Sequence, residues 1–339
     1  MDSNSKFADG PVDTLLVCAS FFGYAREIRL QLERRGRKVA LFEDRPATDS
    51  LTKATIRLAP SLLRAKADAY FARIVEKLRD QPIRDILVIK GEALSPTAIR
   101  HLRAAFPGAH STLYFWDSYR NMPADSREKV GLFDRVLTFD PRDSAADSRL
   151  TYRPLFYLDE YTKLESVAQD IDVLFFGTMH GDRYSVIKRL EQVLPAGTQF
   201  TQILYFQARW LYTARKVFDP AFWLADRRKF IFKPLDKAGI LALIARSRIV
   251  VDVERPIQTG FTMRSVEMLG AGKKLVTTNP EIANADFYNP DNIAIVDRRA
   301  PKVSNEFLRL PYAPPPPEVV RRYGLEHWLE DVLPSSRDR

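Results

Sequence analysis

Short apolar runs alternate with stretches of helical periodicity from the beginning of the chain. Residues 14–20 and 38–42 are predominantly apolar, as expected of strands that are buried on both faces of a parallel sheet. Between them lie a loop with Gly23, a charged helical stretch and a helix-ending Gly36. A strand, a helix and a second strand within about 30 residues predict a right-handed βαβ unit.

The same alternation continues to about residue 155. The spacing of apolar residues predicts a helix over 62–78, and Pro96 marks the start of another helix that reaches residue 106. Further strands are predicted at 85–89, 112–116 and 135–139. Residues 1–155 are therefore predicted to form a doubly wound parallel sheet.

A second α/β series follows in residues 156–315. Its predicted strands are residues 172–176, 247–253, 274–278 and 292–296, and its predicted helices begin near Arg183, Lys237 (after an Asp236 N-cap) and Arg264. Residues 198–232 contain many aromatic residues and show no clear period. After a Pro-rich connector at 311–317, one amphipathic helix is predicted within 316–339.

Composition supports a two-domain globular protein with an anionic partner. The chain has 339 residues, 45% of them hydrophobic and 28% charged. Its 52 Lys and Arg against 43 Asp and Glu give a net charge of +9, which favours a membrane surface, a nucleotide or a nucleic acid. No nucleic-acid partner is expected, because no recognised module is present and the charge is not concentrated in one tail.

One basic run in the first domain favours peripheral contact with an anionic membrane or glycan, or else forms a solvated helix face. It consists of Arg26, Arg29, Arg34, Arg35, Arg37 and Lys38. No apolar run reaches the roughly 18 residues that span a bilayer, and the polar N-terminus does not resemble a secretory signal. The single cysteine, Cys18, excludes a disulfide framework and Cys-based zinc sites. We expect a cytoplasmic protein, with any membrane contact at the inner face.

The most informative segment is residues 258–279. Gly260 and Gly272 bracket a short helix, and backbone N–H groups near Gly260 suit a diphosphate. Arg264 in the first turn offers a bidentate positive fork, and Glu267 lies on the same helical face, where its carboxylate can accept from both hydroxyls of a ribose. The alternative is a surface Arg–Glu pair on a helix between two tight turns.

The run GFTMRSVEMLGAGKKLV at 260–276 resembles the donor-binding segment of GT-B glycosyltransferases. A closer likeness is to bacterial proteins of lipopolysaccharide, capsule or exopolysaccharide assembly, carried by residues 87–92, 113–118, 173–178 and 286–290. This resemblance implies a GT-B fold: two Rossmann-like, doubly wound parallel-sheet domains that face a cleft, with a C-terminal helix packing back across. The domain at 1–155 would bind the acceptor and the domain at 156–315 the nucleotide sugar.

The resemblance also assigns donor-site residues. Glu267 matches the glutamate that binds the donor ribose, and Lys233 and Arg264 would meet the diphosphate. The other expected donor-side residues are Gln258, Thr259, Gly260, Phe261, Thr262, Gly177, His180 and Arg183. Many related enzymes carry a second glutamate, near the donor sugar, at the position of Thr259, so this sequence departs from the pattern. Gln258 would then replace that glutamate as a hydrogen-bonding group. Alternatively, Lys233 is a solvated lysine and His180 an ordinary loop hydrogen-bonder.

Catalytic candidates lie at strand ends of the first domain. Asp117 follows an apolar strand, where it can take a proton from an acceptor hydroxyl, or serve only as an N-cap or turn residue. Glu92 is the second candidate for the base. The acceptor side is expected to include Phe22, Gly23, Tyr24 and Trp116, for which simple aromatic packing is the alternative.

The sequence therefore predicts a hexosyltransferase-like, metal-independent enzyme. It would move a sugar from a UDP- or GDP-type donor to a cell-surface glycan or a lipid-linked acceptor, without a further cofactor. Asp252 and Glu254 are the better metal candidate among the acidic pairs, but helix ends and basic residues suffice for the leaving group. The alternatives are a non-catalytic nucleotide- or glycan-binding protein and a sugar-nucleotide epimerase on the same architecture. ATPase and dehydrogenase functions lose support, since the Gly-rich phosphate motifs of both are missing from the sequence.

Overall fold

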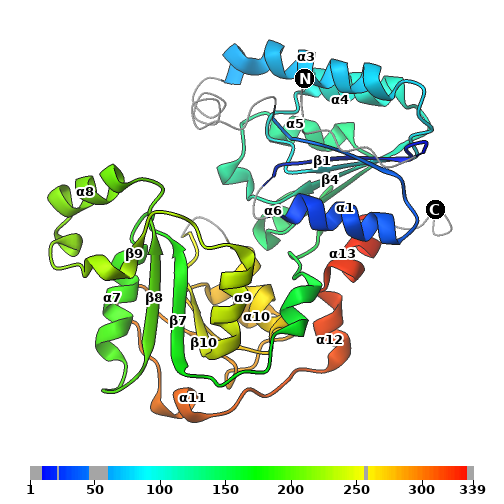
Figure 1. Cartoon of the computed structure of the whole chain (residues 1–339). Helices are drawn as coiled ribbons and strands as arrows, with labels where there is room; N and C mark the ends of the chain where they lie inside the picture. The colour runs from blue at the N-terminus through cyan, green and yellow to red at the C-terminus, as the bar shows by residue number, and fades with distance from the viewer. Residues whose placement is uncertain (1–9, 21–22, 46–59, 256–258, 334–339) are drawn as a thin grey trace. The chain divides into compact units, whose positions relative to one another are not determined.

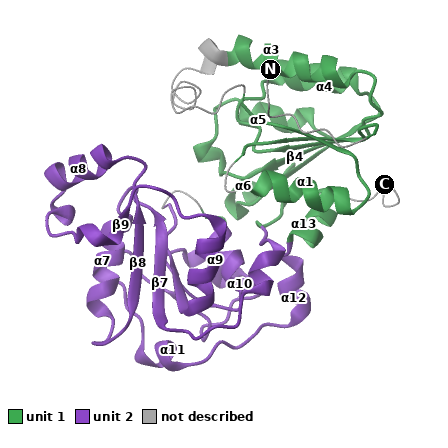
Figure 2. Ribbon diagram, viewed as in Figure 1, with its two compact units in different colours: residues 1–155, 258–260, 325–339 green, residues 156–257, 261–324 purple. Residues whose placement is uncertain are grey.

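The computed structural model describes residues 10–20, 23–45, 60–255 and 259–333. The chain divides into two compact units (Figure 2). Unit 1 contains residues 1–155, 258–260 and 325–339, and unit 2 contains residues 156–257 and 261–324. Each unit is built on one six-stranded sheet. The predicted two-domain α/β fold is thereby confirmed.

The sheet of unit 1 is parallel and has the strand order β2-β1-β3-β4-β5-β6. The strands are β1 (Thr14–Cys18), β2 (Val39–Phe42), β3 (Asp85–Ile89), β4 (His110–Phe115), β5 (Arg135–Thr138) and β6 (Thr151–Tyr152). The first five match predicted strands, because each is an apolar run buried against helices on both faces. The sixth was not predicted, since two exposed residues carry no periodic signal.

Helices cover both faces of this sheet (Figure 1). One face carries α3 (Pro60–Leu78), α4 (Pro96–Ala105) and α5 (Ser126–Lys129), and the other carries α1 (Tyr24–Arg34), α6 (Pro141–Ala146) and α13 (Leu325–Val332). The hydroxyl of Ser95 caps α4 by accepting from the backbone N–H of Ala98.

The C-terminal helix α13 belongs to unit 1 and completes its core. The indole of Trp328 is fully buried and lies edge-on to the Tyr114 ring, with centroids 4.8 Å apart. The guanidinium of Arg153 is 2.6 Å from the carboxylate of Asp331. The prediction that the last helix packs back onto the first domain is therefore confirmed.

The C-terminal segment differs from the prediction in one respect: it forms two helices instead of one. The first, α12 (Pro317–Arg322), belongs to unit 2, and α13 begins at Leu325. The chain breaks because Tyr157 takes carbonyls that a continuous helix would use. Its N–H donates to the carbonyl of Tyr323 at 2.8 Å, and its hydroxyl donates to that of Val320 at 3.1 Å.

The sheet of unit 2 is also parallel, in the order β12-β11-β10-β7-β8-β9. Its strands are β7 (Ile171–Thr178), β8 (Phe200–Tyr205), β9 (Phe230–Ile231), β10 (Ser247–Asp252), β11 (Lys274–Thr277) and β12 (Ile293–Ile295). Its other helices are α7 (Arg183–Val193), α8 (Arg209–Phe218), α9 (Lys237–Arg246), α10 (Met263–Gly270) and α11 (Asn305–Arg309). Asp236 caps α9, as predicted.

The segment 198–232, which showed no clear period, folds as β8, α8, two short 3₁₀ turns and β9. Several of its aromatic side chains come from different elements and converge on one cluster. Phe222 stacks on Tyr184 at 4.3 Å between centroids, and Tyr212 lies 4.8 Å from Phe230. The absence of a period reflects this convergence from several short elements.

No helix among the described residues combines the length and the apolar composition needed to cross a membrane.

Gly270 lies directly against Tyr157, and this contact leaves no room for a side chain. A Cβ at position 270 would be 2.6 Å from a ring carbon of Tyr157. We expect Gly270→Ala to lower the free energy of unfolding of unit 2 by about 1–3 kcal/mol and the melting temperature by several degrees. Gly108→Ala is the matched control, because a Cβ there has no neighbour within 4 Å. Equal melting temperatures for the two variants would contradict the close contact.

Candidate functional site

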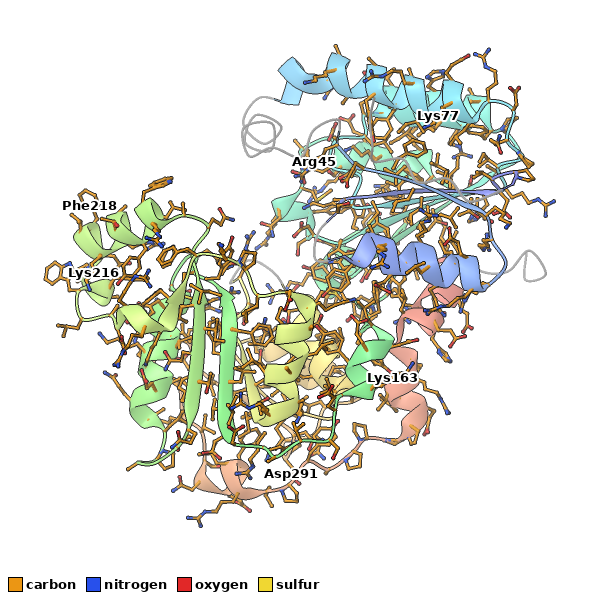
Figure 3. The ribbon with its side chains drawn as sticks, viewed as in Figure 1. Arg45, Lys77, Lys163, Lys216, Phe218 and Asp291 are labelled. Atoms are coloured by element: carbon orange, nitrogen blue, oxygen red, sulfur yellow. The ribbon has the colours of Figure 1, made fainter. Side chains whose placement is uncertain are left out.

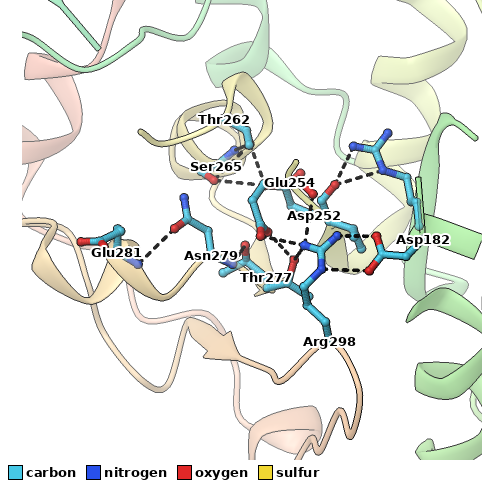
Figure 4. A network of polar contacts seen from close by, with 12 residues as sticks. Asp182, Asp252, Glu254, Thr262, Ser265, Thr277, Asn279, Glu281 and Arg298 are labelled. Carbon is cyan, nitrogen blue, oxygen red and sulfur yellow. Dashed lines mark hydrogen bonds and ion pairs between the residues drawn. The ribbon is translucent and has the colours of Figure 1, made fainter. Parts of the chain in front are cut away.

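In unit 2, the carboxyl ends of β7 and β10 meet the beginning of α10. Parallel strands place their carboxyl ends at one edge of the sheet, where open α/β folds bind ligands. The hydroxyl of Thr262 accepts from the N–H of Ser265 at 3.2 Å, so it caps α10. The same hydroxyl donates to the carboxylate of Asp252 at 2.6 Å (Figure 4). The last residue of β10 thus holds the start of the helix.

On α10, Glu267 is buried and Arg264 is partly buried. The Arg264 guanidinium donates to the carbonyl of Phe176 at 2.5 Å, and its carbon is 3.6 Å from the centre of the Phe176 ring. Glu267 is 5% exposed and accepts from the hydroxyl of Tyr161. Burial, followed by the negative charge of Glu267, raises the pKa of Tyr161, so the phenol stays protonated and donates. Glu267 is therefore not a surface residue, and its role in a donor site stays a prediction.

Arg183 connects the loop after β7 to the end of β10. Its guanidinium donates to the carbonyl of Thr178 at 2.9 Å and, through two nitrogens, to the carbonyl of Val253 at 3.0 and 2.5 Å. Burial, together with the nearby positive charges of Arg264, Arg255 and Arg298, lowers the pKa of Arg183 to about 10. The side chain remains cationic at neutral pH, and its N–H groups fix two loops.

Two arginines of this cluster, Arg255 and Arg298, were not predicted. Arg298 donates to Asp182 and to Glu254, each at 2.7 Å (Figure 4). Arg255, three residues after the end of β10, is exposed. Each follows the end of a strand, the same signal that singled out Lys233, so a systematic search of strand ends would have found them. Four arginines therefore surround the edge of the sheet where α10 begins.

Asp252 and Glu254, the acidic pair considered as a metal site, form hydrogen bonds and an ion pair with other side chains. Asp252 holds Thr262, while Glu254 accepts from Arg298 and from the hydroxyl of Thr278. Burial raises the pKa of Glu254. Within the described part of the chain, no three His, Cys, Asp or Glu side chains are grouped so that they could hold a metal ion.

The remaining donor-side candidates of unit 2, His180, Gly177 and Lys233, lie in or after strands β7 and β9. His180 is half-buried, and its burial, with Arg183 and Arg255 nearby, lowers its pKa to about 4, so it is neutral at pH 7. Gly177 lies within β7. Lys233 is exposed just after the edge strand β9. Because β8 separates β9 from β7, Lys233 starts roughly 10 Å from the end of β7.

Thr259 and Gly260 are held by the end of β5 in unit 1. The hydroxyl of Thr259 donates to the carboxylate of Asp140, which also accepts from the hydroxyl of Ser118. A Cβ on Gly260 would be 2.5 Å from the ring of Phe139, so only glycine fits there. The resemblance assigned Thr259 and Gly260 to the donor site, and in the structure both residues contact residues that follow β5.

Of three further predicted site residues, one packs in the core of unit 2 and two lie outside the described residues. Phe261 is buried in unit 2, edge-on to Phe287 with centroids 5.7 Å apart. Gln258 and Phe22 lie outside the described residues.

In unit 1, charged side chains gather at the carboxyl ends of β2, β3 and β4. The ammonium of Lys90 lies 2.7 Å from the carboxylate of Asp117 and 3.2 Å from that of Glu92. Arg45 also pairs with Glu92. Lys90 has a φ of 75°, which is unusual for a residue with a side chain, and such backbone strain is concentrated at functional sites. Asp117 is not the cap residue of the following turn, which is Ser118.

The two carboxylates differ in access. The side chain of Glu92 is 1% exposed, and that of Asp117 is 20% exposed. Burial alone would raise the pKa of Glu92, but Lys90 and Arg45 outweigh it and lower the pKa. Burial likewise opposes the charge on Lys90, yet Asp117 and Glu92 raise its pKa. Glu92 is therefore an enclosed anion, whereas Asp117 is the carboxylate that solvent reaches.

The aromatic residues of the expected acceptor side pack on one another. Tyr24 and Trp116 are both buried, with centroids 5.7 Å apart, and Trp116 is edge-on to Tyr114. Gly23 precedes α1 with a φ of 78°, a conformation that favours glycine. For Tyr24 and Trp116, aromatic packing is the role that the contacts support.

Solved structures share this architecture, although the chain matches no protein-family model and no curated protein. A glycosyltransferase from Rickettsia africae ESF-5 matches with a TM-score of 0.61 and 12% identity, covering 96% of this chain and 100% of that chain. Anabaena HepE in complex with UDP matches with a TM-score of 0.59 and 13% identity over 95% and 98%. OtsA matches with a TM-score of 0.62 and 11% identity over 95% and 99%. The chain has the GT-B fold.

The GT-B fold confirms what the resemblance implied about architecture. Each of the two sheets has its own edge of charged side chains, around Asp117 in unit 1 and around Glu267 in unit 2. The residues that connect these edges to their surroundings, such as Tyr161 and Lys90, were not among the predicted site residues.

The hydrogen bond from Thr259 to Asp140 generates a prediction about stability. Burial alone would raise the pKa of Asp140, but the hydrogen bonds from Ser118 and Thr259 outweigh it and lower the pKa. We expect Thr259→Val to lower the free energy of unfolding by about 1.5–3 kcal/mol at neutral pH, since a bond to a charged group is lost. Thr198→Val is the control, because its hydroxyl bonds to Pro195 at an exposed position.

The pH dependence of this effect has a definite sign. A carboxyl whose pKa is lowered in the folded state contributes stability at neutral pH, and that contribution is lost as the pH falls through the folded-state pKa. The difference in unfolding free energy between the wild type and Thr259→Val should therefore narrow on acidification, as measured by denaturant titration at a series of pH values. A difference that stays constant or widens would contradict the assigned hydrogen bond.

Proposed function

We propose that the protein is a glycosyltransferase that moves a sugar from a nucleoside-diphosphate donor to a hydroxyl acceptor. The observation that carries this proposal is the buried carboxylate of Glu267 beside Arg264, at the carboxyl edge of the sheet in unit 2. The fold is shared with Anabaena HepE, whose structures contain UDP and UDP-glucose. A UDP-type donor is the first candidate for this chain.

The donor half of the reaction needs a ribose anchor and positive charge for the diphosphate. A carboxylate offers about four lone-pair sites, so Glu267 can accept from ribose hydroxyls while it also accepts from Tyr161. Arg264, the exposed Arg255 and the N-terminus of α10 supply positive charge for the departing diphosphate. Lys233 would add to this charge from the edge strand. These cations make a metal-independent reaction our proposal.

Asp117 is the proposed general base. It would take the proton from the acceptor hydroxyl as that oxygen forms a bond to the anomeric carbon of the donor sugar. The bond from the anomeric carbon to the diphosphate breaks, and the nucleoside diphosphate leaves with both electrons of that bond. A single displacement of this kind inverts the configuration, which agrees with Thr259 in place of a second glutamate. The ammonium of Lys90 lies 2.7 Å from the carboxylate of Asp117 and holds it in place.

The acceptor class is proposed on the sequence resemblance to bacterial cell-surface polysaccharide assembly. A glycan or lipid-linked sugar hydroxyl is the candidate that this resemblance supports. A protein that binds the nucleotide without turnover, and an epimerase that releases an isomerised sugar, are the competing functions, and product analysis separates all three.

Nucleotide binding is the first experiment. In a thermal-shift panel of UDP, GDP, dTDP, ADP and CMP, we expect one nucleoside diphosphate, with UDP first, to stabilise the protein by about 2.7 kcal/mol at roughly 100 times its Kd. Glu267→Gln should weaken that binding by roughly 10- to 100-fold, since hydrogen bonds to a charged group are lost. Glu306→Gln, at an exposed position on α11, should bind as the wild type does. A cooperative melt that no nucleotide shifts would refute the donor site.

Turnover is the second experiment. We expect Asp117→Asn to reduce the release of nucleoside diphosphate from the donor sugar by about 10²–10⁴-fold, the usual contribution of a general base. The thermal shift with the nucleotide should remain, because Asp117 belongs to unit 1 and Glu267 to unit 2. Asp80→Asn, at an exposed position of unit 1, is the control for a loss of charge. Full activity of Asp117→Asn would remove Asp117 from the mechanism.

A further inference from the structure

Exposed apolar side chains are concentrated on one part of unit 2. Eight large hydrophobic residues of the described chain are exposed, and five of them lie within residues 210–224. We call these five the α8 patch: Trp210, Val217, Phe218, Trp223 and Leu224, which are 59–89% exposed. Soluble surfaces seldom collect apolar side chains in this way unless the surface binds something.

The α8 patch makes no contribution to the core beneath it. The buried face of α8 carries Tyr212, which packs on Phe206 and Phe230, while Trp210 and Val217 lie seven residues apart and so share another face. In the turn after α8, Phe222 points inward and the next two residues point out. Figure 3 shows Phe218 and Lys216 on α8, at the side of unit 2 away from strands β7 and β10.

Positive charge surrounds the α8 patch. Residues 209–233 contain seven Lys and Arg against two Asp, so this segment carries +5 of the chain's net charge of +9. Both aspartates are paired inside the segment, Asp219 with Arg215 at 2.8 Å and Asp226 with Arg228 at 3.0 Å. The side chain of Arg228 is 90% exposed. Exposed aromatic side chains and cations are thus close together in this segment of the chain.

We propose that the α8 patch docks the protein on a bilayer surface that contains anionic lipids. Trp and Phe favour the boundary between headgroups and acyl chains, and Lys and Arg beside them bind acidic headgroups at about 1 kcal/mol each. A second copy of the chain is a poorer occupant, because a symmetric interface would bring two segments of charge +5 together. This inference is independent of glycosyl transfer.

The basic run of the first domain, the other candidate for this contact, is less available. Arg29 pairs with Glu33 at 2.7 Å, Arg35 with Glu330 at 3.1 Å, and Arg37 with Asp85. Large exposed apolar residues accompany α8 and are not found among the described residues of α1. The membrane contact that was expected of the first domain is therefore assigned to unit 2.

Binding can be measured with the full chain and vesicles of phosphatidylcholine, with and without phosphatidylglycerol. We expect the protein to sediment with the mixed vesicles, and less so at high salt. The chain has four tryptophans; Trp116 and Trp328 are buried, and Trp210 and Trp223 belong to the α8 patch. A blue shift of the fluorescence, with quenching by brominated lipid, should accompany binding.

Substitutions in the α8 patch and elsewhere test which surface binds the vesicles. The double variant Phe218→Ser, Leu224→Ser should weaken vesicle binding at least tenfold without lowering the melting temperature, since both side chains are more than four-fifths exposed. The control Val167→Ser, Val193→Ser removes exposed apolar groups elsewhere in unit 2 and should bind normally. Arg26→Glu tests the first domain and should have little effect.

Three results would overturn the proposal. The first is no binding to either kind of vesicle by the folded wild type. The second is a result in which Arg26→Glu abolishes vesicle binding while the double variant binds as the wild type does. The third is a dimer, seen by sedimentation without lipid, that the double variant dissociates; it would assign the α8 patch to a second copy of the chain.

Discussion

Neutralisation of buried charge at the carboxyl edges of the sheets is the constraint on which the local structure of both units depends. A charge that is removed from water is costly unless an opposite charge or several hydrogen bonds accompany it. In unit 1, Lys90 lies between Asp117 and Glu92. In unit 2, Arg298 lies between Asp182 and Glu254. These pairs fix the loops after the strands, and the loops in turn present Asp117 and the start of α10.

The arginines of unit 2 divide into those that build the site and those that can bind a ligand. Arg183 uses its guanidinium on backbone carbonyls, and Arg298 uses its own on carboxylates. The charge of Arg183 still raises the positive potential at the edge, because a hydrogen bond to a carbonyl does not neutralise a cation, whereas the charge of Arg298 is balanced by Asp182 and Glu254. Arg255 is exposed and lies in that potential. A site for a diphosphate needs both kinds of residue.

The sequence was sufficient for the fold class. Strands such as β1 and β3 are almost entirely apolar, which is the pattern of a strand buried on both faces. The spacing from Arg264 to Glu267 on a short helix suggested a nucleotide site, which stays a prediction. The break between α12 and α13 could not be predicted, because it depends on Tyr157, which is 163 positions from Val320. Tyr161 was missed for the same reason, since its role comes from a contact with Glu267 that no local pattern records.

The position of α13 has a consequence for the order in which the protein folds. The first sheet is synthesised before unit 2, but the helix whose Trp328 packs on Tyr114 is synthesised only after unit 2. Throughout the synthesis of unit 2, the nascent first domain therefore exposes the apolar surface that α13 later covers. Domains usually fold in the order of their synthesis. Here the first domain is begun before unit 2 and completed after it.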